Sequence, residues 1–303
     1  LLSLLILPTC FVNAQPFNNP LHIPDTLSGT IFNLDLAPGT VQFRPGPPTN
    51  TYGYNGDYLG PTLIFNKGDF IQLNVTNNLP DTTTTHWHGM HVSPMDDGGP
   101  HTPILSGQTW SPDFEVLDRA TTFWYHPHLH GNTNLHVSRG AAGMIIVRDQ
   151  EEAALTLPRT YGVDDIPIII QSKSLAPNNQ IEIMGPDLTL MVNGTIGPEV
   201  DCPAQMVRFR ALNASSNRVY NIGVNDSRNF FQIGTDGGLL EAPVTLNRLR
   251  LSPGERAEFV VDFSGDIGNQ LFLQSYADEF PPFIPGGPTP DSTNPLDLSL
   301  IHI

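Results

Sequence analysis

The stretch Phe70-Ile71-Gln72-Leu73-Asn74-Val75 alternates apolar and polar side chains. An alternation with a period of two places the apolar side chains on one face, which is typical of a half-buried β-strand. The segments on either side, Asn66-Lys67-Gly68-Asp69 and Asn77-Asn78-Leu79-Pro80-Asp81, are rich in residues that form turns. The sequence therefore predicts a strand between two turns, and this pattern recurs along the chain.

Further strands are expected in both halves of the chain. The clearest apolar runs cover residues 142–147, 166–171, 206–210 and 258–263. The 29 Pro and 27 Gly among 303 residues favour many short strands and turns over long helices. A chain of this length suits two domains of ordinary size. Together these features predict an all-β protein with two β-sandwich or barrel domains.

The composition limits the partners that the protein can have. Acidic residues outnumber basic residues by 30 to 14, so the net charge is −16. This charge argues against a nucleic acid partner, because phosphate binding needs a basic surface. No apolar run reaches the roughly 18 residues that a membrane-spanning helix needs, so we expect no membrane span.

The first residues have the composition of an export signal. Residues 1–12 are apolar, and Val12-Asn13-Ala14 has the small-residue character of a cleavage site. We interpret residues 1–14 as a partial signal peptide; a lipoprotein signal at Cys10 and a buried N-terminal strand are the alternatives. The expected location is secreted or periplasmic. Cleavage after residue 14 would leave Cys202 as the only cysteine, which allows no intrachain disulfide.

Changes in composition also indicate the domain boundaries. The polar residues 148–152 close a first domain at residues 27–150, and a second domain is expected at residues 158–280. Residues beyond this are first rich in Pro and Gly and then alternate again from residue 296. We therefore expect residues 281–303 to be a linker and the start of a further domain.

Histidines are strongly clustered, with seven of the ten between positions 86 and 130. His86-Trp87-His88 and His126-Pro127-His128 are two His-X-His pairs, 40 positions apart. In a strand, side chains at i and i+2 project from the same face, roughly 7 Å apart. Two such strands side by side would offer four imidazoles to neighbouring metal ions, and copper(II) binds most tightly among the divalent ions that imidazole favours. The alternative is that these histidines are polar strand residues that face water.

Thr85-His86-Trp87-His88-Gly89 and the segment at residues 124–131 resemble the first two copper motifs of the multicopper oxidases, most closely the bacterial laccase-like, copper efflux oxidase and bilirubin oxidase branch. Residues 232–238 and 251–258 resemble that family's second domain. The resemblance covers residues 27 to 280. It implies tandem cupredoxin-like domains of Greek-key topology.

The resemblance also implies roles for single residues. His86 would bind the type 2 copper, and His88, His126 and His128 would bind the type 3 pair of a trinuclear copper cluster. In the family this cluster reduces dioxygen to water with electrons from a phenolic, tetrapyrrole or metal-ion substrate, passed on by a type 1 copper. Asp97 matches an acidic residue that assists proton delivery, so it is the candidate catalytic residue; the alternative is a turn aspartate before Gly98-Gly99.

Half of the copper ligands of the family are missing from this sequence. The trinuclear cluster takes eight histidines, and the His-Pro-X-His-X-His and His-Cys-His motifs do not occur among the 303 residues. Cys202 has no flanking histidine, so the type 1 site is absent and Cys202 is expected to be a buried thiol. The resemblance implies the N-terminal two-domain fragment of a three-domain protein, with the C-terminal cupredoxin domain as its missing partner. We expect this fragment to bind copper weakly and to be inactive alone.

The remaining histidines receive other interpretations. We expect His130 to hydrogen-bond near the cluster from the face that carries His126, and His91 to lie on the opposite face of its strand. His101 and His136 lie in loop-like contexts and are expected to be solvated. The aromatic residues of the motifs are expected to be core residues; they are Trp87, Trp124 and Tyr125.

Three other functions compete with an oxidase. A zinc hydrolase of the metallo-β-lactamase type needs His-X-His-X-Asp-His, whereas Gly89-Met90-His91 follows His88. A copper nitrite reductase needs a His-Cys-His stretch, which is absent. A non-catalytic tandem cupredoxin that binds copper or acts as a scaffold stays open as the main alternative.

Overall fold

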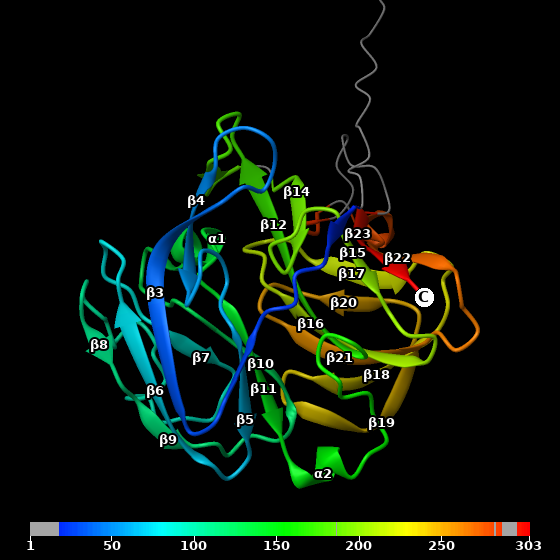
Figure 1. Ribbon diagram of the computed structural model, residues 1–303, viewed down its shortest axis with the longest axis horizontal. Coiled ribbons are helices and arrows are strands. Elements are labelled where there is room, and N and C mark those ends of the chain that lie inside the picture. The colour runs from blue at the N-terminus through cyan, green and yellow to red at the C-terminus, as the bar shows by residue number, and fades with distance from the viewer. Residues whose placement is uncertain (1–17, 186, 282, 287–295) are drawn as a thin grey trace, which may run out of the picture.

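The computed structural model describes residues 18–185, 187–281, 283–286 and 296–303. The predicted signal segment and most of the predicted linker lie outside these residues. The described chain forms four β-sheets, which pack in pairs as two sandwiches that lie side by side (Figure 1). The predicted all-β fold with two sandwich domains is thereby confirmed.

The first sandwich holds strands from the N-terminal half of the chain. One sheet has the order β2 (Thr26–Ser28), β5 (Thr62–Asn66), β11 (Gly143–Arg148), β10 (Thr121–His126), β7 (His86–His88). The facing sheet has the order β4 (Thr49–Tyr54), β3 (Ile31–Val41), β6 (Phe70–Asn77), β8 (Thr109–Trp110), with β9 (Asp113–Glu115) also paired to β6. The chain crosses between the two sheets several times, and some neighbouring strands, such as β3 and β6, run parallel.

Strand β6 shows why the sequence pattern forms this sandwich. Its side chains at Ile71, Leu73 and Val75 are fully buried between the two sheets, whereas Phe70 stays exposed. Burying aliphatic side chains of this size stabilises a fold by about 1.5–3 kcal/mol each. The expected strand is confirmed, and its apolar face is the core face.

The second sandwich is built in the same way from later strands. Its six-stranded sheet has the order β1 (Asn19–Pro20), β15 (Pro198–Asp201), β23 (Leu296–His302), β22 (Gln270–Ser275), β17 (Tyr220–Val224), β20 (Leu249–Leu251). The seven-stranded sheet has the order β13 (Ile181–Glu182), β12 (Asp165–Leu175), β16 (Met206–Asn213), β21 (Arg256–Asp262), β18 (Phe230–Thr235), β19 (Gly238–Leu246), with β14 (Thr189–Val192) paired to β12.

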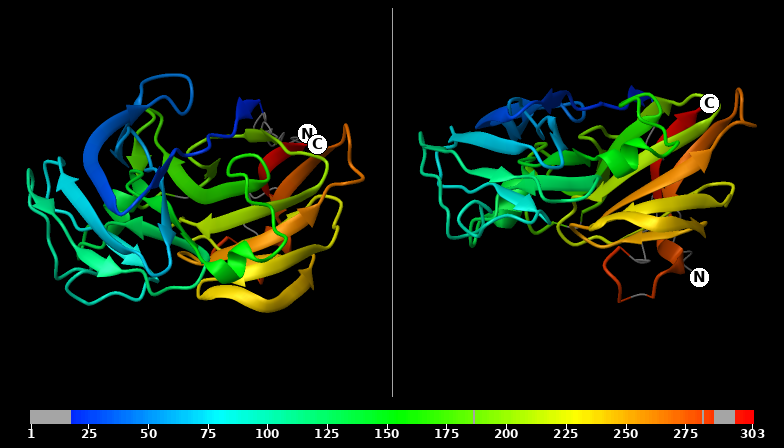
Figure 2. Two further views of the ribbon diagram at one scale, coloured as in Figure 1. Left: turned by 60° about the horizontal axis from the view of Figure 1, so that its bottom comes forward. Right: turned by 90° about the horizontal axis from the view of Figure 1, so that it is seen from below.

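The last described strand differs from its sequence-based interpretation. Residues 296–303 were expected to begin a further domain, but β23 pairs antiparallel with β22 and parallel with β15. Its Ile301 is buried in the core of the second sandwich. On the other side of β15 lies β1, from which the N-terminal segment crosses to the first sandwich (Figure 2). Strands from both ends of the described chain therefore complete this sheet.

Helices are few and short. They are α1 (Thr133–Ser138), α2 (Gln150–Ala153) and the 3₁₀ turn η1 (Ala277–Glu279). Within the described residues, none has the length and apolar character that a membrane crossing requires. Helix α1 lies next to the candidate site, and α2 follows directly after the last strand of the first sandwich.

A buried ion network joins the two sandwiches. Arg208 and Arg210 on β16 contact Glu258 on β21, Asp165 on β12 and Glu152 on α2. Arg210 lies 2.7 Å from both Asp165 and Glu258, and Arg208 lies 2.8 Å from Glu152. Burial by itself would raise the pKa of Glu258, but the guanidinium groups of Arg210 and Arg208 lower it to about 2. Glu258 is therefore ionised at neutral pH.

Candidate metal centre

The pairing of β7 with β10 brings the two His-X-His motifs together. In their antiparallel register His86 lies opposite His126, and His88 lies opposite Trp124. Since alternate residues of a strand share a face, the three imidazoles gather on one side. Trp87 points the other way into the core and is fully buried. The local alternation of the motifs thus separates the histidines from the core aromatic side chain.

The imidazoles lie close enough together to hold metal ions. The ring centroids of His86, His88 and His126 are 5.3–5.6 Å apart in each pair. One nitrogen from each ring lies within 4.8 Å of the other two, and His88 Nδ1 is 3.1 Å from His126 Nε2. His128 lies at the edge of this group, with its ring centroid 5.3 Å from that of His86 and its side chain exposed.

The Nδ1 atoms of His86 and His126 each have a backbone carbonyl partner. His86 Nδ1 lies 2.9 Å from the carbonyl oxygen of Asp97, and His126 Nδ1 lies 2.8 Å from that of Pro127. A carbonyl can only accept, so each Nδ1 carries the proton and each Nε2 keeps its lone pair. This arrangement fixes the tautomer and ring orientation, as partners of metal-binding histidines generally do.

The environment keeps the imidazoles of His88 and His126 neutral. Burial, together with the nearby Arg256, His86 and His128, lowers the pKa of His88 to about 4. Burial also lowers the pKa of His126 well below its usual value, against the opposing effect of the Pro127 carbonyl. Neutral imidazole is the form that binds metal ions. The cluster can therefore offer lone pairs at neutral pH.

A cleft of about 480 Å³ opens onto the cluster between α1 and the second sandwich. Its walls include His88, His126 and Trp124, with Asn134 and Gly254 on the facing elements. Trp124 stacks on His126 with the ring centroids 3.9 Å apart. The cluster is therefore shielded on one side by an aromatic ring and reachable by small molecules on the other.

Asp97 lies beside His86, on the loop that follows β7. Its Oδ2 is 3.1 Å from His86 Nδ1, and its side chain is 31% exposed. The backbone N–H of Trp87 donates to the Asp97 carbonyl over 3.2 Å. Gly98 allows this close approach, because it has a φ of +72° and a Cβ there would lie 1.7 Å from the carbonyl oxygen of Thr85. The loop thus holds a partly exposed carboxylate against a cluster histidine.

Two predictions about the outer histidines are wrong. His136 was expected to be a solvated loop residue, but it lies in α1, is fully buried and has its Nδ1 3.1 Å from Thr83 Oγ1. A helix of six residues is too short to show its period in the sequence. His130 does not continue the face of His126, because β10 ends at His126 and the chain leaves the strand.

Other sequence-based expectations hold. His91 is turned away from the cluster and contacts Asp118, with 2.6 Å between Nδ1 and Oδ1, and His101 is exposed. Cys202 is buried and unpaired, and burial, helped by Asp201, raises the pKa of its thiol to about 12. The thiolate that a blue copper site requires is therefore disfavoured at Cys202.

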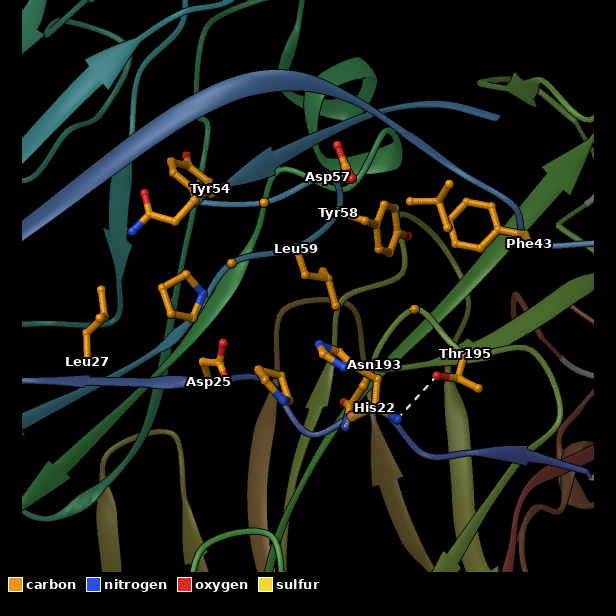
Figure 3. A pocket seen from close by; sticks show the side chains of 17 residues that line it. His22, Asp25, Leu27, Phe43, Tyr54, Asp57, Tyr58, Leu59, Asn193 and Thr195 are labelled. Atoms are coloured by element: carbon orange, nitrogen blue, oxygen red, sulfur yellow. Dashed lines mark hydrogen bonds between the residues drawn. The ribbon is translucent and has the colours of Figure 1, made fainter. Parts of the chain in front are cut away.

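A second cleft, of about 510 Å³, lies between the first sandwich and a turn of the second (Figure 3). It is lined by the N-terminal segment with His22 and Asp25, by Phe43 and Tyr58, and by a turn of the second sandwich that includes Thr195. The backbone N–H of His22 donates to Thr195 Oγ1 over 3.3 Å. His22 is the only histidine that lines this cleft, so it does not form a second histidine cluster.

Two cupredoxin-like sandwiches with a paired-histidine centre between short strands define a class of copper proteins. A family model described as multicopper oxidase matches residues 35–152. The solved laccase-like multicopper oxidase CueO of Ochrobactrum sp. superimposes with a TM-score of 0.85 at 34% identity, over 93% of this chain and 63% of that chain. McoA of Aquifex aeolicus gives a TM-score of 0.84 at 30% identity, over 94% and 64%. The chain belongs to the multicopper oxidase family.

Curated relatives carry two kinds of name. Multicopper oxidase mco of Staphylococcus haemolyticus is 36% identical over 248 residues, which is 80% of this chain and 55% of the relative. Cell division protein FtsP of Escherichia coli strain K12 is 39% identical over 254 residues, which is 81% of this chain and 54% of the relative. The chain thus spans about half the length of the curated relatives it matches.

Proposed function

We propose that His86, His88, His126 and His128 bind copper as half of the ligands of a trinuclear centre. His86 would hold the type 2 ion, and the other three would hold the type 3 pair. The observation that carries this proposal is the group of three imidazoles with nitrogens within 4.8 Å of one another. When bound, the copper ions would supply the redox chemistry by which the family reduces dioxygen to water.

The donor set fits copper better than a structural zinc site. Imidazole suits both metals, but structural zinc sites are closed by four ligands around one ion and often include thiolates. Here the facing nitrogens of His88 and His126 belong to opposite strands, and no cysteine is near them among the described residues. Family membership also implies copper.

Asp97 is the proposed catalytic residue of this chain. Its carboxylate contacts His86 and is partly open to solvent, so it can hold a proton at Oδ2 and exchange it with water. Reduction of dioxygen to water consumes protons, and a carboxylate at the edge of a buried cluster is suited to deliver them. Through the same contact, Asp97 would also keep the ring of His86 in its binding orientation.

The reducing substrate is proposed to be a small phenolic, tetrapyrrole or metal-ion donor. The Ochrobactrum relative is described as active towards lignin model compounds and lignosulfonate, which favours phenols. Because the Cys202 thiol is buried and protonated, the type 1 copper and the other half of the ligands would come from a further cupredoxin domain outside these residues. The whole protein would be exported, as residues 1–14 suggest.

Copper titration of this chain tests the proposal. We expect copper(II), measured against a competing chelator, to bind the wild-type chain and to give an electron paramagnetic resonance spectrum with imidazole nitrogen couplings. His126→Ala should weaken binding at least tenfold, whereas His101→Ala, at an exposed histidine outside the cluster, should not. Equal binding by the His126 variant and the wild type would overturn the assignment.

A non-catalytic copper-binding or scaffold protein is the second candidate. The observation in its favour is that several relatives at 35–39% identity are named cell division protein FtsP. Substitution of His88 and His128 separates the two functions in the full-length protein. If the protein is an oxidase, the variant would lose dioxygen consumption. If it is a scaffold, the variant would keep its biological function, and the wild type would already lack copper-dependent oxidase activity.

A further inference from the structure

A side chain of the second sandwich reaches the strands that carry the histidines. Arg256 is the first residue of β21 and is 4% exposed. Its Nε donates to the carbonyl oxygen of Thr122 over 3.2 Å, and its Cζ lies 5.5 Å from the ring centroid of Phe123. Thr122 and Phe123 belong to β10, the strand that ends at His126. Arg256 therefore supports this strand from the opposite sandwich.

The same guanidinium also lies against the exit of β7. Gly89, which directly follows His88, has a φ of +89°, and a Cβ there would lie only 2.6 Å from Arg256 Nη2. Gly254, in the turn just before Arg256, also packs on the site, since a Cβ there would lie 3.3 Å from His88 Cε1. The second sandwich thus packs closely on His88, and glycine at position 89 leaves room for the guanidinium.

Asp236 holds Arg256 in this place. The carboxylate Oδ1 of Asp236 lies 2.7 Å from Arg256 Nη1 and accepts from the Arg256 backbone N–H over 2.7 Å. Arg256 Nη2 donates to the Asp236 carbonyl over 3.1 Å. Two residues further along β21, Glu258 accepts from Thr122 Oγ1 over 2.7 Å. Asp236 therefore holds both the backbone and the guanidinium group of Arg256. Strand β21 contacts Thr122 twice, through Arg256 at the Thr122 carbonyl oxygen and through Glu258 at the Thr122 hydroxyl group.

Strand β7 needs such support. It has three residues and lies at the edge of its sheet, where β10 is its only strand partner among the described residues. A short edge strand with one neighbour is easily displaced, and metal ligands must be held to within about 0.5 Å. Packing of Arg256 against both strands would limit this displacement.

We propose that Arg256 is a positioning residue that sets the spacing of the β7 and β10 histidines for copper. This inference rests on the proposed copper site. A positioning role and a purely electrostatic role predict opposite effects of Arg256 removal on copper affinity. If Arg256 acted only through its positive charge, its removal would strengthen the binding of a copper cation. Positioning predicts weaker binding, and it predicts this also for Arg256→Lys, which keeps the charge but cannot reach both Thr122 and Asp236.

The matched control is Arg228, which also lies in the second sandwich. It contacts two carboxylates, Asp226 and Asp266, and its Cζ lies 5.5 Å from the ring centroid of Phe263. These three partners all lie within the second sandwich, away from β7 and β10. Arg228→Met therefore removes comparable contacts without touching the proposed site.

The test measures copper(II) affinity and the electron paramagnetic resonance spectrum of the whole chain, with circular dichroism as the check on folding. We expect Arg256→Met to bind copper at least tenfold more weakly than the wild type with altered nitrogen couplings, Arg256→Lys to be intermediate, and Arg228→Met to be unchanged. Wild-type affinity and spectrum in a folded Arg256→Lys variant would overturn the inference, as would an equal loss in Arg228→Met. Failure of the wild type to bind copper would instead overturn the proposed function.

Discussion

Replacement of Glu258 by Gln should destabilise the folded chain. Glu258 is fully buried and is held by Arg208, Arg210 and Thr122. Gln keeps the shape of the side chain but removes the charge that balances two buried guanidinium groups. Breaking a buried ion pair by removing one partner costs roughly 3–5 kcal/mol, because the other charge is left uncompensated.

The pKa of Glu258 gives a second measure of the same interaction. It falls from the ordinary value of 4.5 to about 2 in the folded chain, which corresponds to about 3 kcal/mol at about 1.4 kcal/mol per pKa unit. Because the folded-state pKa is depressed, this stabilisation is present at pH values above 4.5 and is lost as the pH falls towards 2. The loss caused by Glu258→Gln should therefore depend on pH in the same window.

Urea unfolding at a series of pH values tests this reasoning. At pH 7 the variant should lose about 3–5 kcal/mol in the free energy of unfolding, and the difference from the wild type should shrink by about 3 kcal/mol between pH 4.5 and pH 2. The control is Glu241→Gln on the exposed part of β19, which should change the free energy by less than about 0.5 kcal/mol. A loss that is below 1 kcal/mol, or that does not vary with pH, would refute the argument.

Three further predictions concern the site. Gly89→Ala should weaken copper binding at least tenfold, and in a double-mutant cycle with Arg256→Lys the two losses should be less than additive; strict additivity would contradict their contact. Asp97→Asn in the full-length protein should retain copper, measured by metal analysis, but reduce dioxygen at least tenfold more slowly; unchanged turnover would remove Asp97 from proton delivery. Cys202→Ser should leave copper stoichiometry and the visible spectrum of this chain unchanged, and loss of a blue absorption band would show that the thiol binds copper.

Local patterns in the sequence predicted the features that are set within a single strand, namely its apolar face and the spacing of its histidines. The alternation at residues 70–75 is visible because β6 is buried on one face and partly exposed on the other. The two His-X-His motifs were recognisable for the same reason, since their side chains keep a period of two. Resemblance to a known family then supplied the roles of His86 and His126, which spacing alone left open between metal binding and solvation.

Contacts between distant segments could not be predicted in this way. The strand register that sets His86 opposite His126 depends on tertiary structure. The hydrogen bond from Arg256 to Thr122 does so too, because the two residues lie more than 100 positions apart in sequence. His136 was misjudged because a helix of six residues is too short to show a period and because its burial depends on packing against other segments. The pairing of β23 with β15 was missed because its alternation is the same whichever sheet receives it.

The contact between Arg256 and β10 also has a consequence for the order of events on the ribosome. His126 is synthesised 130 residues before Arg256. At about 5–20 residues per second, the delay is on the order of 6–26 s. During this interval the histidine-bearing strands exist without the side chain that we propose sets their spacing. Copper offered to the nascent chain would therefore meet a looser set of ligands than copper offered after release.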